Sequence, residues 1–149
     1  MFKYKLEPVL SLKEKIEDNK KRELAIVNGR YQSLQQQKKD LIQNKELAIE
    51  QAKKQSDKRV NIQMLKQLTH YTAYMDRAIE EKSKEVVVAA AQVEEKRNEL
   101  IEAVKQRKIL DKLKEIQFEV YKDEEKQEEN RIMDEIVTYR FGTKKEEDE

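Results

Sequence analysis

The side chains that most often carry catalysis or bind metals are scarce in this sequence. His70 is the only histidine and there is no cysteine, which nearly excludes a zinc site and Cys–His chemistry. No glycine-rich loop that could cradle a phosphate is present. Acidic residues are abundant, but paired carboxylates need a dry cleft to separate their acidities, and we expect none here. The sequence therefore predicts a protein that is not an enzyme and uses no cofactor or metal, with His70 on a helix surface.

Residue types suited to binding gather between residues 70 and 79. Met75 belongs to an apolar stripe, whereas Tyr71, Tyr74 and Ala78 lie to the sides of that stripe. Tyrosine is favoured at protein interfaces because it combines a large apolar area with a polar group. Two interpretations remain open: these side chains pack over the edge of the stripe, or they form a docking site for a partner.

The element that must position this cluster is a very long helix. Residues 30–141 contain no glycine or proline and consist largely of strong helix formers. Apolar positions in the second half recur at alternating steps of three and four, as in a coiled coil. This stripe runs through Leu65, Leu68, Thr72, Met75, Ile79, Lys82, Val86, Ala89, Val93, Lys96, Leu100, Ala103, Arg107 and Leu110. Its charged members lower stability but can fix register and partner number.

Residues that favour helix starts and ends divide this pattern into two helices. Pro8 suits a first helical turn, which predicts a helix over residues 8–55. The stripe fades near residues 53–59, so we expect a turn at about 56–61, with Ser56, Asp57 or Asn61 as the N-cap. The second helix is predicted over residues 62–141, approximately, and Gly142 is expected to end it. Residues 142–149 are predicted to be a disordered tail. A continuous helix is the alternative.

Together these features predict an all-α fold in which two long helices form one antiparallel coiled-coil hairpin with a longer second helix, over residues 1–141. From the assumed turn, the numbers of paired residues should add up to about 117. The six-residue apolar run 86–91 is favoured as a dry, close-packed section of this hairpin over a contact with another protein. Phe2, Tyr4 and Leu6 either fold back onto the first turn or wait for a partner.

Composition limits the classes of partner. Charged residues make up 42% of the chain, yet the net charge is +1 and the two signs are interspersed, which argues against binding to nucleic acid. The longest apolar run is far below the roughly 20 residues that a membrane helix needs. We expect a soluble, cytosolic protein without direct membrane insertion, which reaches a membrane only through a partner.

Three segments resemble the FliJ family, the soluble coiled-coil component of the bacterial flagellar export apparatus. The first is residues 2–10 (FKYKLEPVL) followed by residues 22–25 (RELA). The second is the aromatic segment 71–75 with residues 78–80. The third is residues 131–136 (RIMDEI) through Tyr139, Arg140 and Phe141. Their order and spacing extend the resemblance over nearly the whole chain.

This resemblance implies a two-helix antiparallel coiled coil, similar to the central stalk of rotary ATPases, that binds and stimulates the hexameric export ATPase. It also implies contact with the large membrane protein of the export gate, a role as export chaperone with substrate chaperones as further partners, and a place at the inner face of the cell membrane at the flagellar base. The implied gate contacts are Tyr71, Tyr74, Met75 and Ala78; Lys82 departs from the family pattern. The implied contacts with the ATPase ring are Phe2, Leu6, Met133, Tyr139 and Phe141.

Two other interpretations are compatible with the pattern. A structural coiled coil could dimerise through the same stripe, and the mass of the protein in solution separates that case from a hairpin within one chain. The equivalent stalk protein of a virulence type III secretion system would share the architecture and serve another machine.

Overall fold

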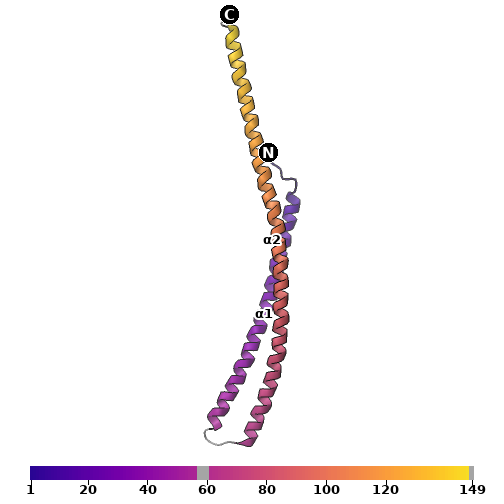
Figure 1. Cartoon of the computed structure of the whole chain (residues 1–149), viewed down its shortest axis with the longest axis vertical. Coiled ribbons are helices and arrows are strands. Elements are labelled where there is room, and N and C mark those ends of the chain that lie inside the picture. The colour runs from indigo at the N-terminus through magenta and orange to yellow at the C-terminus, as the bar shows by residue number, and fades with distance from the viewer. Residues whose placement is uncertain (57–60, 148–149) are drawn as a thin grey trace. The chain divides into compact units, whose positions relative to one another are not determined.

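Two helices make up nearly all of the part of this chain that the structure describes. The computed structural model describes residues 1–56 and 61–147, and it contains α1 (Glu7–Ser56) and α2 (Ile62–Glu147). The helices are 50 and 86 residues long and run antiparallel to each other (Figure 1). The predicted fold class, an antiparallel coiled-coil hairpin with a longer second helix, is confirmed.

The hairpin consists of two compact units, and both helices contribute to each. The first unit contains Met1–Ile16 and Val104–Glu149, and the second contains Glu17–Ala103. In both units, side chains of α1 meet side chains of α2.

Polar groups of the backbone and of one side chain define where the helices start. The backbone N–H of Leu10 donates to the carbonyl of Leu6 at 2.9 Å, so α1 begins at Glu7, one residue earlier than Pro8. The side-chain oxygen of Asn61 accepts a hydrogen bond from the N–H of Gln63 at 3.1 Å, which is N-cap geometry. Of the three candidates, Asn61 is therefore the cap that the structure contains. Asp57 and most of the expected turn lie outside the described residues.

The end of α2 differs from the expectation. Helix α2 continues through Gly142 to Glu147, whereas the sequence favoured Gly142 as its stop and a disordered tail from there on. A glycine stop requires positive φ, and neither glycine has it. A helical glycine costs only about 1 kcal/mol relative to alanine, and the Thr143 hydroxyl donates back to the Tyr139 carbonyl at 3.1 Å.

The second unit has a thin core along the predicted stripe. The four buried residues of α2 (Met75, Ala89, Val93 and Ala103) all belong to that stripe, and Leu34 is buried on α1. The apolar run 86–91 is not a dry section on all sides, because Val87 and Val88 are 68% and 58% exposed. In a two-helix hairpin, each helix is covered by its partner on one face only. Side chains of an apolar run that point away from the partner therefore stay in solvent.

In the first unit, the segment before α1 packs onto α2. Tyr4 is buried and its hydroxyl donates to the carbonyl of Leu110 at 3.0 Å. The ring of Phe2 lies 5.2 Å from that of Phe118 and 5.5 Å from that of Tyr121. Beyond this contact, every residue of α2 from 122 to 147 is exposed.

The register of the hairpin differs slightly from the expected one. Lys20 pairs with Glu99, Glu23 with Lys96 and Lys45 with Asp76. Their residue numbers add up to 119, 119 and 121, against an expected value of about 117. Long charged side chains reach along the helix axis, so these ion pairs can join residues that are not directly opposite.

Candidate functional site

The aromatic cluster of α2 divides into an outward and an inward part. Tyr71 and Tyr74 are 40% and 63% exposed, and Ala78 is half-buried. Met75 is only 4% exposed. Because Met75 fills the seam between the helices, it cannot offer its side chain to a partner without opening the hairpin.

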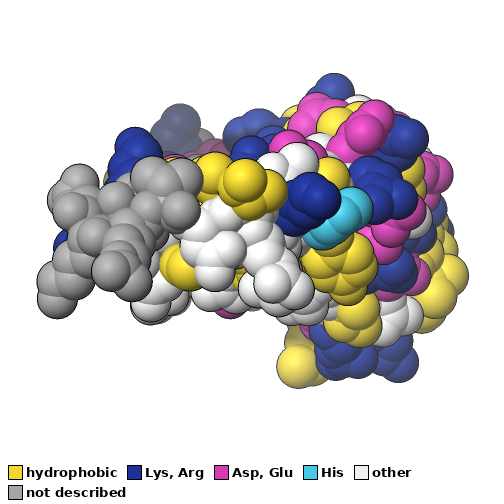
Figure 2. Space-filling model, turned by 90° about the horizontal axis from the view of Figure 1, so that it is seen from below, with side chains coloured by type: hydrophobic (Ala, Val, Ile, Leu, Met, Phe, Trp, Pro, Cys, Tyr) yellow, Lys and Arg dark blue, Asp and Glu magenta, His cyan; other side chains and the backbone are white. Residues whose placement is uncertain are grey.

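A groove of about 470 Å³ lies beside Tyr71, between α1 and α2 in the second unit. One stripe on each helix lines it: Asn44, Leu47, Ala48, Gln51, Ala52 and Gln55 on α1, and Met64, Gln67, Leu68 and Tyr71 on α2. None of these ten residues is charged, although 42% of the chain is. In the view of Figure 2, hydrophobic side chains lie below the single histidine, and Lys or Arg side chains flank it.

The absence of charge decides what this groove can do chemically. An apolar segment that docks there removes no charged group from water, so the main desolvation cost of an interface is avoided. The carboxamides can donate and accept hydrogen bonds at the rim. The groove and the exposed tyrosines therefore form one continuous candidate for protein recognition, which we name the tyrosine groove.

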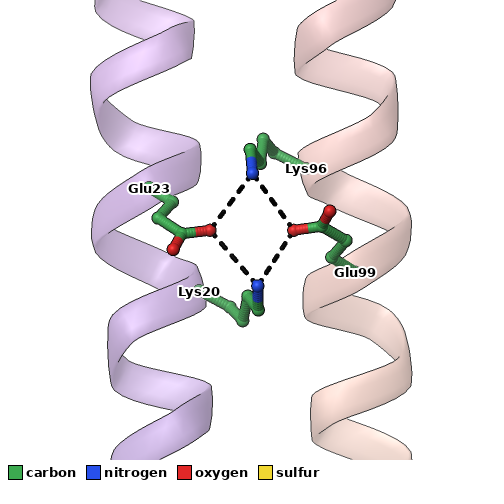
Figure 3. A network of polar contacts seen from close by, with 4 residues as sticks. All are labelled: Lys20, Glu23, Lys96 and Glu99. Carbon is green, nitrogen blue, oxygen red and sulfur yellow. Dashed lines mark hydrogen bonds and ion pairs between the residues drawn. The ribbon is translucent and has the colours of Figure 1, made fainter.

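An array of four charged residues joins the helices further along the second unit (Figure 3). Its members are Lys20 and Glu23 on α1 and Lys96 and Glu99 on α2, and we name it the ion quartet. Across the helices, Lys20 lies 3.1 Å from Glu99 and Lys96 lies 3.3 Å from Glu23. Within each helix, the lysine lies 3.4 Å (α1) or 3.3 Å (α2) from the glutamate three residues on.

Each carboxylate of the quartet accepts hydrogen bonds from both lysines, and this shifts four pKa values. Hydrogen bonds from Lys96 and then Lys20 lower the pKa of Glu23 below its ordinary value of 4.5. Hydrogen bonds from Lys20 and then Lys96 lower the pKa of Glu99 in the same way. Bonds to Glu99 and Glu23 raise the pKa of both lysines above 10.5. All four groups are therefore charged at neutral pH.

The end of α2 offers a second exposed apolar surface. Met133, Tyr139 and Phe141 are 62%, 74% and 69% exposed, respectively. The other apolar side chains of this surface, which we name the terminal surface, are Ile132, Ile136 and Val137. All six lie in the part of α2 whose residues are exposed throughout.

The structure does not bring Phe2 and Leu6 together with the terminal surface. Both residues are half-buried, and the ring of Phe2 contacts Phe118 and Tyr121. Tyr121 precedes Met133 by about three helical turns. The five residues expected to face one partner thus occupy two separate places on the first unit.

Sequence reasoning missed the ion quartet and the tyrosine groove. The signal for the quartet was present, because Lys-x-x-Glu occurs at residues 20–23 and again at 96–99. It becomes meaningful only when the two copies face each other. The signal for the groove was the run of amides on one face of residues 44–55.

The described part of the chain shows no group of three or more histidine or acidic side chains that could hold a metal ion. His70 lies on the surface (Figure 2). Within the residues that the structure covers, neither helix contains a stretch long and apolar enough to cross a membrane.

Comparison with curated proteins gives no match. Among solved structures, this chain is similar to the YscO homologue CT670 from Chlamydia trachomatis, with a TM-score of 0.52 and 21% sequence identity. The alignment covers 98% of this chain and 99% of that chain, and at this identity it supports the shared fold alone. The family model described as "Flagellar FliJ protein" matches residues 2–146. This chain therefore belongs to the FliJ family of coiled-coil proteins associated with type III protein export.

Proposed function

We propose that this chain binds and stimulates the hexameric ATPase of the flagellar export apparatus as a stalk. The observation that carries this proposal is the terminal surface of α2. There, a single helix exposes six apolar side chains over the ten residues 132–141, without cover from α1. Exposed apolar clusters of this kind mark interaction sites, and a single unpaired helix is narrow enough to dock onto or into a ring.

We also propose that the second unit contacts the membrane protein of the export gate. Tyr71 and Tyr74 expose aromatic area next to an uncharged groove, and aromatic residues commonly dominate binding energy at interfaces. Ala78 lies at the edge of this surface. Met75 would act indirectly, by packing in the seam and fixing the helix that presents the two tyrosines.

Contact with the gate would place the protein in the cytoplasm, at the inner face of the membrane beneath the flagellum. A role as export chaperone, with substrate chaperones as partners, completes the proposal. The tyrosine groove supports this role, because an uncharged groove between two helices fits the apolar face of a third helix.

The ATPase proposal is tested by measuring ATP hydrolysis by the export ATPase of the same organism with and without this protein. We expect stimulation, and we expect the triple variant Met133→Ser, Tyr139→Ser, Phe141→Ser to lose it. The matched control is Val87→Ser, Val88→Ser, which removes equally exposed apolar side chains elsewhere on α2 and should stimulate fully. Equal stimulation by both variants would contradict an ATPase contact at the terminal surface.

The gate proposal is tested by binding to the cytoplasmic part of the gate protein. Tyr71→Ala with Tyr74→Ala should weaken binding at least tenfold while helicity and melting temperature stay nearly unchanged. Tyr139→Ala, an exposed tyrosine outside this surface, is the control and should bind normally. A large loss of helicity in the double variant would make the two tyrosines part of the core and refute the docking role.

A further inference from the structure

We infer that the ion quartet sets the register of the two helices in the second unit of the hairpin. It belongs to neither proposed binding surface, and the inference does not depend on the proposed function. It rests on how the four charges face one another (Figure 3) and on what would face them in any other pairing.

The repeated Lys-x-x-Glu spacing places opposite charges beside each other in the observed register. On antiparallel helices, the lysine of each copy lies beside the glutamate of the other, at 3.1 Å for Lys20–Glu99 and 3.3 Å for Lys96–Glu23. All four charges find an opposite charge only when Lys20 lies beside Glu99 and Glu23 lies beside Lys96, so the quartet favours this register.

Register follows from what lies one heptad away on α2. An apolar seam tolerates a slip of seven residues, because one small apolar residue then replaces another. After such a slip, Glu23 would leave Lys96 and face Ala103 or Ala89, both of which are buried. Lys20 would leave Glu99 and face Gln106 or Gln92. Every cross-helix ion pair of the quartet would be lost, and a carboxylate would be pressed against the driest part of the seam.

Within the second unit, the apolar seam is poorly equipped to set the register by itself. Its buried residues on α2 include two alanines at Ala89 and Ala103, which offer little shape to distinguish one pairing from the next. Near the turn, Ala48, Ala52, Met64 and Leu68 are only half-buried, so refolding a turn of helix there disrupts little packing.

Exposure indicates that the quartet acts on specificity more than on stability. The four side chains retain 30–43% of their exposure, and ion pairs accessible to solvent add little to stability. Polar residues placed in a coiled-coil seam commonly exclude wrong registers at a cost in stability. Neutralising the quartet should therefore leave the helices folded and make their register ambiguous.

The test is thiol cross-linking, which the chain permits because it contains no cysteine. Lys45→Cys with Asp76→Cys reports the native register, since these residues form a cross-helix pair. Lys45→Cys with Ser83→Cys, or with Thr69→Cys, reports a slip of one heptad in either direction. Seven residues displace a thiol by about 10 Å along a helix. A bis-maleimide whose span is shorter than this displacement therefore distinguishes the three registers.

The decisive variant replaces the quartet with neutral side chains: Lys20→Met, Glu23→Gln, Lys96→Met and Glu99→Gln. We expect a melting temperature at least equal to that of the parent, and cross-links at a slipped pair at a level well above the parent's. A neutral variant that forms only the native cross-link would overturn the inference, because the apolar seam alone would then set the register.

Charge reversal gives a second, independent arm. Reversing only α1 (Lys20→Glu, Glu23→Lys) should reduce the native cross-link severalfold, and adding the reversal of α2 (Lys96→Glu, Glu99→Lys) should restore it. The matched control reverses Lys112 and Glu115, an exposed pair within α2 at 3.1 Å, and should change nothing. If the fourfold reversal fails to restore the native cross-link, the inference is wrong even when the α1 reversal alone unfolds the protein.

Discussion

Glu23 on α1 and Lys96 on α2 are 73 positions apart in the chain, and their charged groups lie 3.3 Å from each other across the helix interface. Lys96 occupies a position of the apolar stripe, and Glu23 reaches it from the edge of the helix interface. This contact, with its counterpart between Lys20 and Glu99, makes one section of the interface electrostatic. That section should respond to pH and to substitution differently from the apolar sections.

Acid should weaken the hairpin partly through this section. The pKa values of Glu23 and Glu99 are lowered in the folded chain, so their contribution is present above about pH 4.5 and is lost as the pH falls through the lowered values. Glu23 and Glu99 are only two of the 31 acidic residues in the chain. The informative quantity is therefore the fall in melting temperature between pH 7 and pH 3, which should be smaller in Glu23→Gln, Glu99→Gln than in the parent. Identical falls would mean that the quartet adds nothing to acid sensitivity.

Tyr4 should anchor the segment before α1 to α2. Tyr4→Phe removes only the hydroxyl that donates to the Leu110 carbonyl and should cost about 0.5–1.5 kcal/mol. Tyr4→Ala also removes a ring that is 7% exposed and should cost about 3–5 kcal/mol. Urea denaturation followed by circular dichroism measures both, with Tyr139→Phe as an exposed control. A Tyr4→Ala variant as stable as the parent would show that this segment is not docked in solution.

Gly29 should be a position where stability can be gained. It lies inside α1 without a positive φ, and a Cβ atom added there meets nothing within 4 Å. Because glycine is a poor helix former, Gly29→Ala should raise the free energy of unfolding by about 0.5–1 kcal/mol. Chemical denaturation measures the gain. A loss of stability would indicate that α1 needs a flexible point at this residue.

Met75 and Tyr74 are neighbours in sequence and should behave in opposite ways. Met75→Ala creates a cavity in the seam, since Met75 is 4% exposed, and should cost about 2–5 kcal/mol. Tyr74→Ala changes a side chain that is 63% exposed and should stay within about 0.5 kcal/mol of the parent. Comparing their denaturation midpoints separates the core role from the surface role. Equal losses would require Tyr74 to be packed.

Much of the fold could be read from periodicity. The alternating stripe from Leu65 to Leu110 contains all four residues that are buried on α2, because a supercoiled helix returns the same face to its partner every seven residues. The start of α1 near Pro8 followed from local backbone chemistry. The same chemistry named Ser56, Asp57 and Asn61 as candidate caps, and the structure selects Asn61. Residue type alone also predicted that His70 lies on the surface.

Expectations were wrong or undecided for residues whose role depends on what they contact in the folded chain. Gly142 could end a helix or continue it, and its φ decided the matter. Val87 and Val88 belong to an apolar run, yet a partner of one helix covers only one face, so they remain exposed. From the sequence, Tyr4 and Phe2 could fold back onto the first helical turn or wait for a partner. The structure shows that both pack against α2.

The sequence by itself determined the local properties of this protein: helix-forming tendency, the period of its apolar face, and the absence of cysteine. Only the tertiary structure decided which residues meet across the hairpin, and with that the ion quartet, the charge-free tyrosine groove and the buried place of Met75. The physical reason is that a period fixes which face of a helix is apolar and leaves open which heptad of the partner lies opposite. That choice depends on contacts between residues as far apart in the chain as Glu23 and Lys96.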